Sequence, residues 1–105
     1  MMRRINLSNR AVKRLDDLLA FLEKEWSPKV KNNFILKLDK SIRQIQKLPE
    51  SFPASEKIKG LRKCTVTKQT TVYYSFSDSS IDIVTIFDNR KNPESLRKEV
   101  KNFKK

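Results

Sequence analysis

The chain has 105 residues, the size of one ordinary domain, and 37% of them are apolar, which suffices for one compact core. Lys and Arg outnumber Asp and Glu by 24 to 12, so the net charge is +12 at pH 7. Such a charge attracts polyanions, either nucleic acid or a strongly acidic protein, and would also suit a ribosomal or membrane-surface protein.

The chain has no histidine and one cysteine, Cys64. An intramolecular disulfide, a Cys–His catalytic pair and the common zinc-site patterns are therefore excluded. The N-terminus has no apolar run after its charges, and no segment is long enough to span a bilayer. We expect a cytoplasmic protein that binds no membrane and needs no metal or other cofactor.

The first half of the chain predicts a short strand and a helical hairpin. After a strand at 5–7, Ser8 can cap a helix through its hydroxyl. Ser27-Pro28 separates this helix from a second one, which ends at Pro49. Both helices have apolar residues at steps of three and four, which predicts that one face of each packs in the core. The two stripes are Ala11, Leu15, Leu18, Leu22 and Trp26, widened by Val12 and Leu19, and then Val30, Phe34, Leu38, Ile42, Ile45 and Leu48.

The second half predicts a three-stranded meander. A loop at 49–60 carries two prolines and the only glycine. Strand-like segments follow at 61–66, 70–76 and 81–87, with turns at 68–69 and 77–80. We expect Cys64 to be buried, and Tyr73 and Tyr74 to point to opposite faces, one in the core and one exposed. A last charged helix is predicted from Pro93 onward.

This order predicts a single α+β domain over 1–105, β-α-α-β-β-β(-α), with the hairpin packed on one face of a small, mainly antiparallel sheet. With these residues it resembles the toxins of the RelE/ParE superfamily over essentially the whole chain. The segments that carry the resemblance are Ile5–Ser8 with Ala11 and Leu15, Pro49, Gly60–Lys63, Val72–Phe76, Ile81–Phe87 and Asp88–Pro93.

The resemblance implies the toxin of a type II toxin–antitoxin pair, a growth inhibitor neutralised by an acidic cognate antitoxin. RelE-like members cleave messenger RNA on the ribosome with clustered Lys and Arg, whereas ParE-like members inhibit DNA gyrase without cleaving RNA. Because a strongly basic chain suits a site made of ribosomal RNA, we favour the endoribonuclease. Gyrase inhibition and a non-toxic basic nucleic-acid-binding domain remain the alternatives.

By the same resemblance, Lys63 and Arg90 fall at positions of catalytic residues, the lysine as a base and the arginine as a bidentate phosphate ligand. Lys63 also fits an ordinary solvated strand residue, and Arg90 a structural partner of Asp88. Residues expected to bind RNA or another target are Arg62, Lys68, Tyr73 and Lys91. The sequence departs from the nuclease pattern at Thr65, at Thr70 or Thr71, and in the lack of a tyrosine near its end.

Overall fold

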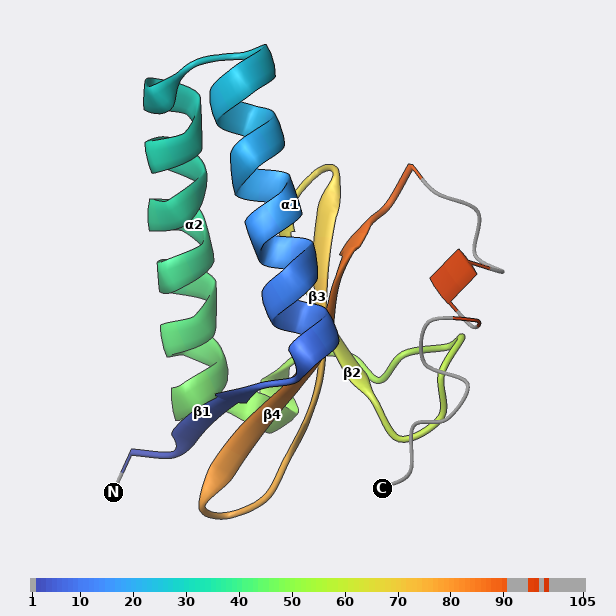
Figure 1. The fold of residues 1–105 in the computed structure, drawn as a ribbon. Helices are drawn as coiled ribbons and strands as arrows, with labels where there is room; N and C mark the ends of the chain where they lie inside the picture. The colour runs from blue at the N-terminus through green and yellow to red at the C-terminus, as the bar shows by residue number, and fades with distance from the viewer. Residues whose placement is uncertain (1, 91–94, 97, 99–105) are drawn as a thin grey trace.

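A computed structural model describes residues 2–90, 95, 96 and 98. The predicted order of elements is confirmed as far as the last strand, and most of the expected final helix lies outside the described residues. Two helices pack on a four-stranded sheet, an α+β fold (Figure 1). The elements are β1 Arg4–Leu7, α1 Asn9–Glu25, α2 Pro28–Lys47, the 3₁₀ turn η1 Pro49–Ser51, β2 Arg62–Thr67, β3 Thr70–Phe76 and β4 Ser80–Asp88.

The two helices begin where the sequence predicts. The hydroxyl of Ser8 accepts a hydrogen bond from the Ala11 amide at 3.0 Å, and that of Ser27 accepts one from the Val30 amide at 3.2 Å. Each satisfies an amide that has no partner within the first helical turn. None of the helices in the described ranges is long and apolar enough to cross a membrane.

The sheet has the strand order β1-β4-β3-β2. The meander is antiparallel, while β1 pairs parallel with β4, so that Ile5 lies opposite Ile81. Between Tyr73 and Tyr74 the register shifts, because Tyr73 pairs with Thr85 and Tyr74 with Ile83, which leaves Val84 as an extra residue on β4. The hairpin covers one face of this sheet.

The sheet has a small core on each face. The main core lies under the hairpin and contains Phe34, Leu38, Ile45 and Tyr74. On the outer face, Leu61, Tyr73, Phe87 and Leu96 form a second cluster. The prediction that one of the two tyrosines would be exposed is wrong, since Tyr73 is 4% exposed and Tyr74 0%. The two rings do point to opposite faces, but a loop and Leu96 cover the outer face as well.

The prediction that Trp26 lies in the core is wrong, because its side chain is 68% exposed. Figure 1 shows that the tip of the hairpin, where α1 meets α2, projects beyond the ends of β3 and β4. The residues near this tip therefore have no layer opposite them. Periodicity identifies the inward face of a helix but not where the opposing layer ends.

Cys64 lies in the main core, 3% exposed, as the sequence predicts. Burial raises the pKa of its thiol, which outweighs the opposing hydrogen bond to Ser41. Because the thiolate is the reactive form, we expect the native protein to react with a thiol reagent far more slowly than the unfolded chain. Labelling monitored by mass spectrometry, with and without denaturant, measures this difference, and equal rates would contradict it.

The buried hydroxyl of Tyr74 should make the protein less stable at high pH. Its hydroxyl donates to the carbonyl oxygen of Pro49 at 2.6 Å, and burial raises its pKa from 10.0 to about 12. An unfolded tyrosine therefore loses its proton first, so the stabilisation is complete below pH 10 and is lost as pH rises toward 12.

The free energy of unfolding should thus fall by about 2–3 kcal/mol across this window on account of Tyr74. Urea denaturation at pH 8 and pH 11.5 measures the decrease in the wild type and in Tyr74→Phe. The variant should be less stable at pH 8 by about 1–3 kcal/mol, because the Pro49 carbonyl loses its donor, but should decline less with pH. Parallel declines in both proteins would show that Tyr74 is not responsible.

Candidate functional site

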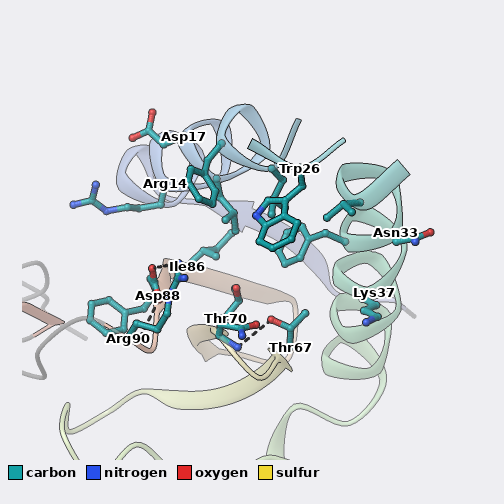
Figure 2. A pocket seen from close by; sticks show the side chains of 17 residues that line it. Arg14, Asp17, Trp26, Asn33, Lys37, Thr67, Thr70, Ile86, Asp88 and Arg90 are labelled. Atoms are coloured by element: carbon teal, nitrogen blue, oxygen red, sulfur yellow. Dashed lines mark hydrogen bonds and ion pairs between the residues drawn. The ribbon is translucent and has the colours of Figure 1, made fainter. Parts of the chain in front are cut away.

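A cleft of about 700 Å³ lies where the hairpin extends past the sheet. Its walls come from the C-terminal half of α1, the N-terminal half of α2, the β2–β3 turn and the ends of β3 and β4 (Figure 2). The apolar lining residues are Leu18, Phe21, Leu22, Trp26, Val30, Phe34, Ile86 and Phe87. The polar lining residues are Arg14, Asp17, Asn33, Lys37, Thr67, Gln69, Thr70, Asp88 and Arg90.

Three of the apolar lining side chains are unusually exposed. Phe21 is 45% exposed, Trp26 68% and Val30 37%. Large apolar groups gathered in a cleft and rimmed by polar residues are typical of a binding surface. From the sequence, Trp26 was expected in the core and Phe21 was not singled out, because periodicity does not show how the hairpin is positioned along the sheet.

Arg90 lies at the sheet end of the cleft and is held by Asp88. The guanidinium Nε and Nη2 donate to the two carboxylate oxygens at 3.0 and 2.9 Å, and the backbone amide of Arg90 donates to Oδ1 at 2.9 Å. The hydrogen bonds, and then the charge of Asp88, raise the pKa of Arg90 further above its usual range. The side chain remains 64% exposed. Asp88 engages Nε and one donor of Nη2, so the two donors of Nη1 and the second donor of Nη2 form the edge that suits a further carboxylate or phosphate.

Asn89 fastens the end of β4 to the β2–β3 turn. Its Oδ1 accepts from the Thr71 hydroxyl at 2.8 Å, its Nδ2 donates to the Lys68 carbonyl at 3.2 Å, and its backbone amide donates to the Gln69 carbonyl at 2.7 Å. The cleft wall that carries Thr67, Gln69 and Arg90 is thereby held as one unit.

The family model of the ParE toxin of the type II toxin–antitoxin system parDE matches residues 5–93. The chain belongs to the ParE toxin family. The match extends over most of the sequence and does not depend on a single motif. The cleft is built on the helical hairpin and the β1-β4-β3-β2 sheet. No curated protein matches the sequence itself.

Solved structures of low identity show the same fold as this ParE-family chain. A chain of the chromosomal ParDE system from P. aeruginosa is 16% identical with a TM-score of 0.69, and the match covers 83% of this chain and 96% of that one. A chain of the E. coli DinJ–YafQ toxin–antitoxin complex is 17% identical with a TM-score of 0.55, and the match covers 86% of this chain and 96% of that one. A conserved hypothetical protein from Helicobacter pylori is 21% identical with a TM-score of 0.56, and the match covers 87% of this chain and 98% of that one.

Lys63 and Arg90 are not brought together in this ParE-family structure. Lys63 pairs with Tyr73, and Tyr73 pairs with Thr85 on the next strand, so the Lys63 side chain belongs to the outer face of the sheet. Thr85 precedes Arg90 by five residues along the chain. The Lys63 ammonium is 3.9 Å from Glu56. Arg90 instead lines the cleft on the side of the hairpin.

The residues expected to bind a target are also dispersed. Arg62 donates to the carbonyls of Glu50 and Phe52 and lies over the Phe76 ring, so it fastens the loop before β2. Tyr73 packs edge-on against Phe87 with 6.4 Å between ring centroids and is not accessible for stacking on a base. Lys68 is exposed in the β2–β3 turn, and Lys91 lies outside the described residues.

The cleft is therefore better suited to binding a partner than to proton transfer, because Lys63 and Arg90 do not lie together in it. Of the five predicted positions that the structure describes, Arg90 is the only one that lines the cleft. Arg90 cannot act as a general base, because arginine stays protonated. The apolar cleft with its arginine fork is the candidate functional site.

Proposed function

We propose that the chain is the toxin of a type II toxin–antitoxin pair and that it arrests growth by binding DNA gyrase rather than by cleaving messenger RNA. The observation that carries this proposal is the cleft, in which exposed aromatic side chains lie beside a fixed arginine fork while Lys63 lies on the other face of the sheet. Membership of the ParE family supports the same choice.

We also propose that an acidic antitoxin occupies this cleft. The P. aeruginosa and E. coli structures with this fold come from toxin–antitoxin systems, and the net charge of +12 favours an acidic partner. Apolar side chains of the antitoxin would cover Phe21 and Trp26, and a carboxylate would bind Arg90. Neutralisation then follows, because the antitoxin covers the arginine that the target would otherwise contact.

The endoribonuclease favoured by the sequence is the competing function. It needs a base that activates the 2′-hydroxyl and a group that protonates the leaving oxygen. Lys63 and Arg90 do not share a site, and burial raises the pKa of both tyrosines. The cationic groups of the cleft can bind a phosphate, but they do not by themselves supply this pair of proton transfers.

The two functions are separated by one paired experiment. Purified protein is added to a gyrase supercoiling assay, and primer extension is run on messages from cells that express it. We expect inhibited supercoiling, no new codon-phased RNA ends, and growth restored by an acidic protein encoded in the adjacent reading frame. Codon-phased ends with unimpaired supercoiling would establish the nuclease instead.

A further inference from the structure

The two helices of the hairpin differ sharply in charge. α1 carries four Lys or Arg and four Asp or Glu, whereas α2 carries six Lys or Arg and a single acid, Asp39. A neutral outer surface on α1 shows that a solvated helix in this fold does not require excess charge. Of the two helices, α2 therefore carries the excess of positive charge.

Four cations of α2 lie with one leucine along its outer side, in what we call the α2 stripe: Lys29, Leu36, Lys40, Arg43 and Lys47. All five residues are exposed. They follow one another at steps of seven, four, three and four, which places them on one face of a helix. The buried residues Phe34, Leu38, Ser41 and Ile45 form the opposite face. Figure 1 shows α2 at the edge of the molecule, beside α1.

The α2 stripe is only weakly neutralised. Asp39 pairs with Arg43 at 2.9 Å, but within the described residues no ion pair involves Lys29, Lys40 or Lys47. The helix dipole favours a cation in the last turn, which accounts for Lys47. It does not account for Lys29 or Lys40, which lie before that turn. The stripe runs roughly 27 Å from Lys29 to Lys47, a length along which one strand of a duplex presents about eight phosphates.

We propose that the α2 stripe binds double-stranded DNA in the major groove. That groove, about 12 Å wide, admits an α-helix, whereas the major groove of an RNA duplex is too narrow. Lys and Arg would contact phosphates, and Leu36 at the centre of the stripe, 68% exposed, fits the base edges, where thymine presents a methyl group.

Other occupants fit the α2 stripe less well. Single-stranded nucleic acid is held mainly by stacking on aromatic rings, and the one aromatic residue of α2, Phe34, is buried. An acidic peptide would need several apolar anchors to order it, and Leu36 is the only apolar member of the stripe. This surface is separate from the cleft, and the inference does not depend on gyrase being the target.

Matched charge variants test the proposal by direct binding. A fluorescein-labelled 16-base-pair DNA duplex is titrated with the full-length chain in an anisotropy assay, at several salt concentrations. Lys40→Gln/Lys47→Gln removes two charges from the α2 stripe, and Lys13→Gln/Lys24→Gln removes two exposed charges from α1. We expect the first variant to bind at least tenfold more weakly at 0.1 M salt, with a salt slope shallower by about two, and the second to behave as wild type.

Three results would overturn the proposal. Equal losses in the two variants would show that only total charge matters, and absence of binding by the wild type would remove the interaction altogether. Tighter binding of an RNA duplex of the same sequence would assign the α2 stripe to RNA. Circular dichroism of both variants checks that the helices are intact. None of these readouts involves growth arrest or supercoiling, so this inference and the proposed function can fail separately.

Discussion

Replacing Phe21 and Trp26 together with alanine should weaken binding of the acidic antitoxin at least a hundredfold. Both side chains line the cleft while remaining largely exposed in the free chain, so a partner that covers them gains apolar burial that folding has left unused. Aromatic residues at the centre of an interface commonly contribute about 2 kcal/mol or more each when truncated. Isothermal titration calorimetry with the purified antitoxin measures the loss.

The chain offers a matched control in Val12→Ala/Leu48→Ala. Val12 is 44% exposed and Leu48 60%, close to the 45% of Phe21 and 68% of Trp26, but neither lines the cleft. This variant should bind the antitoxin like wild type. Similar melting temperatures for both double variants would show that folding is unaffected. If the two variants lost affinity equally, the cleft would not be the antitoxin site.

The hairpin and the three-stranded meander were predictable because their causes are local. Ser8 and Ser27 cap helices through bonds to residues three positions away, and Pro28 sets the break between the helices. The change from a period near 3.6 to strand-like segments after Gly60 marks the start of the meander. Such signals depend on neighbouring residues, which a single sequence displays directly.

The features that could not be predicted depend on what lies opposite each residue. Tyr73 alternates with Tyr74 as a strand requires, yet it is buried because Leu61 and Leu96 cover the outer face. Trp26 continues the apolar stripe of α1, yet the sheet ends before reaching it. In both cases the local pattern gives the direction of the side chain correctly, and a distant segment decides whether that direction leads to core or solvent.

The candidate site was predicted at one position, Arg90, and that limit has the same origin. Lys63 and Arg90 were grouped because each occupies a position matched in related toxins. Whether two such residues meet depends on strand register and on the face to which each belongs. The cleft itself arises because the tip of the hairpin projects past the sheet, a property of the assembled layers.

Arg90→Ala should raise the concentration of protein needed for half-inhibition of gyrase by about ten- to a hundredfold. The fork is fixed by Asp88 before any partner binds, so the contact incurs little ordering cost. Arg90→Lys should restore only part of the inhibition, because an ammonium cannot reproduce a planar bidentate donor. Stability should change little, since an exposed ion pair contributes about 0–1 kcal/mol.

Lys13→Ala is the control for charge in this experiment. Lys13 is likewise exposed and paired with a carboxylate, Asp17, at 3.6 Å, but it does not line the cleft; its loss should leave inhibition unchanged. In a nuclease, Arg90→Ala would instead slow single-turnover cleavage by roughly two orders of magnitude with ribosome binding intact, because the guanidinium would act mainly in the transition state. Unchanged inhibition by Arg90→Ala would mean that the guanidinium serves only as the partner of Asp88 at the end of β4.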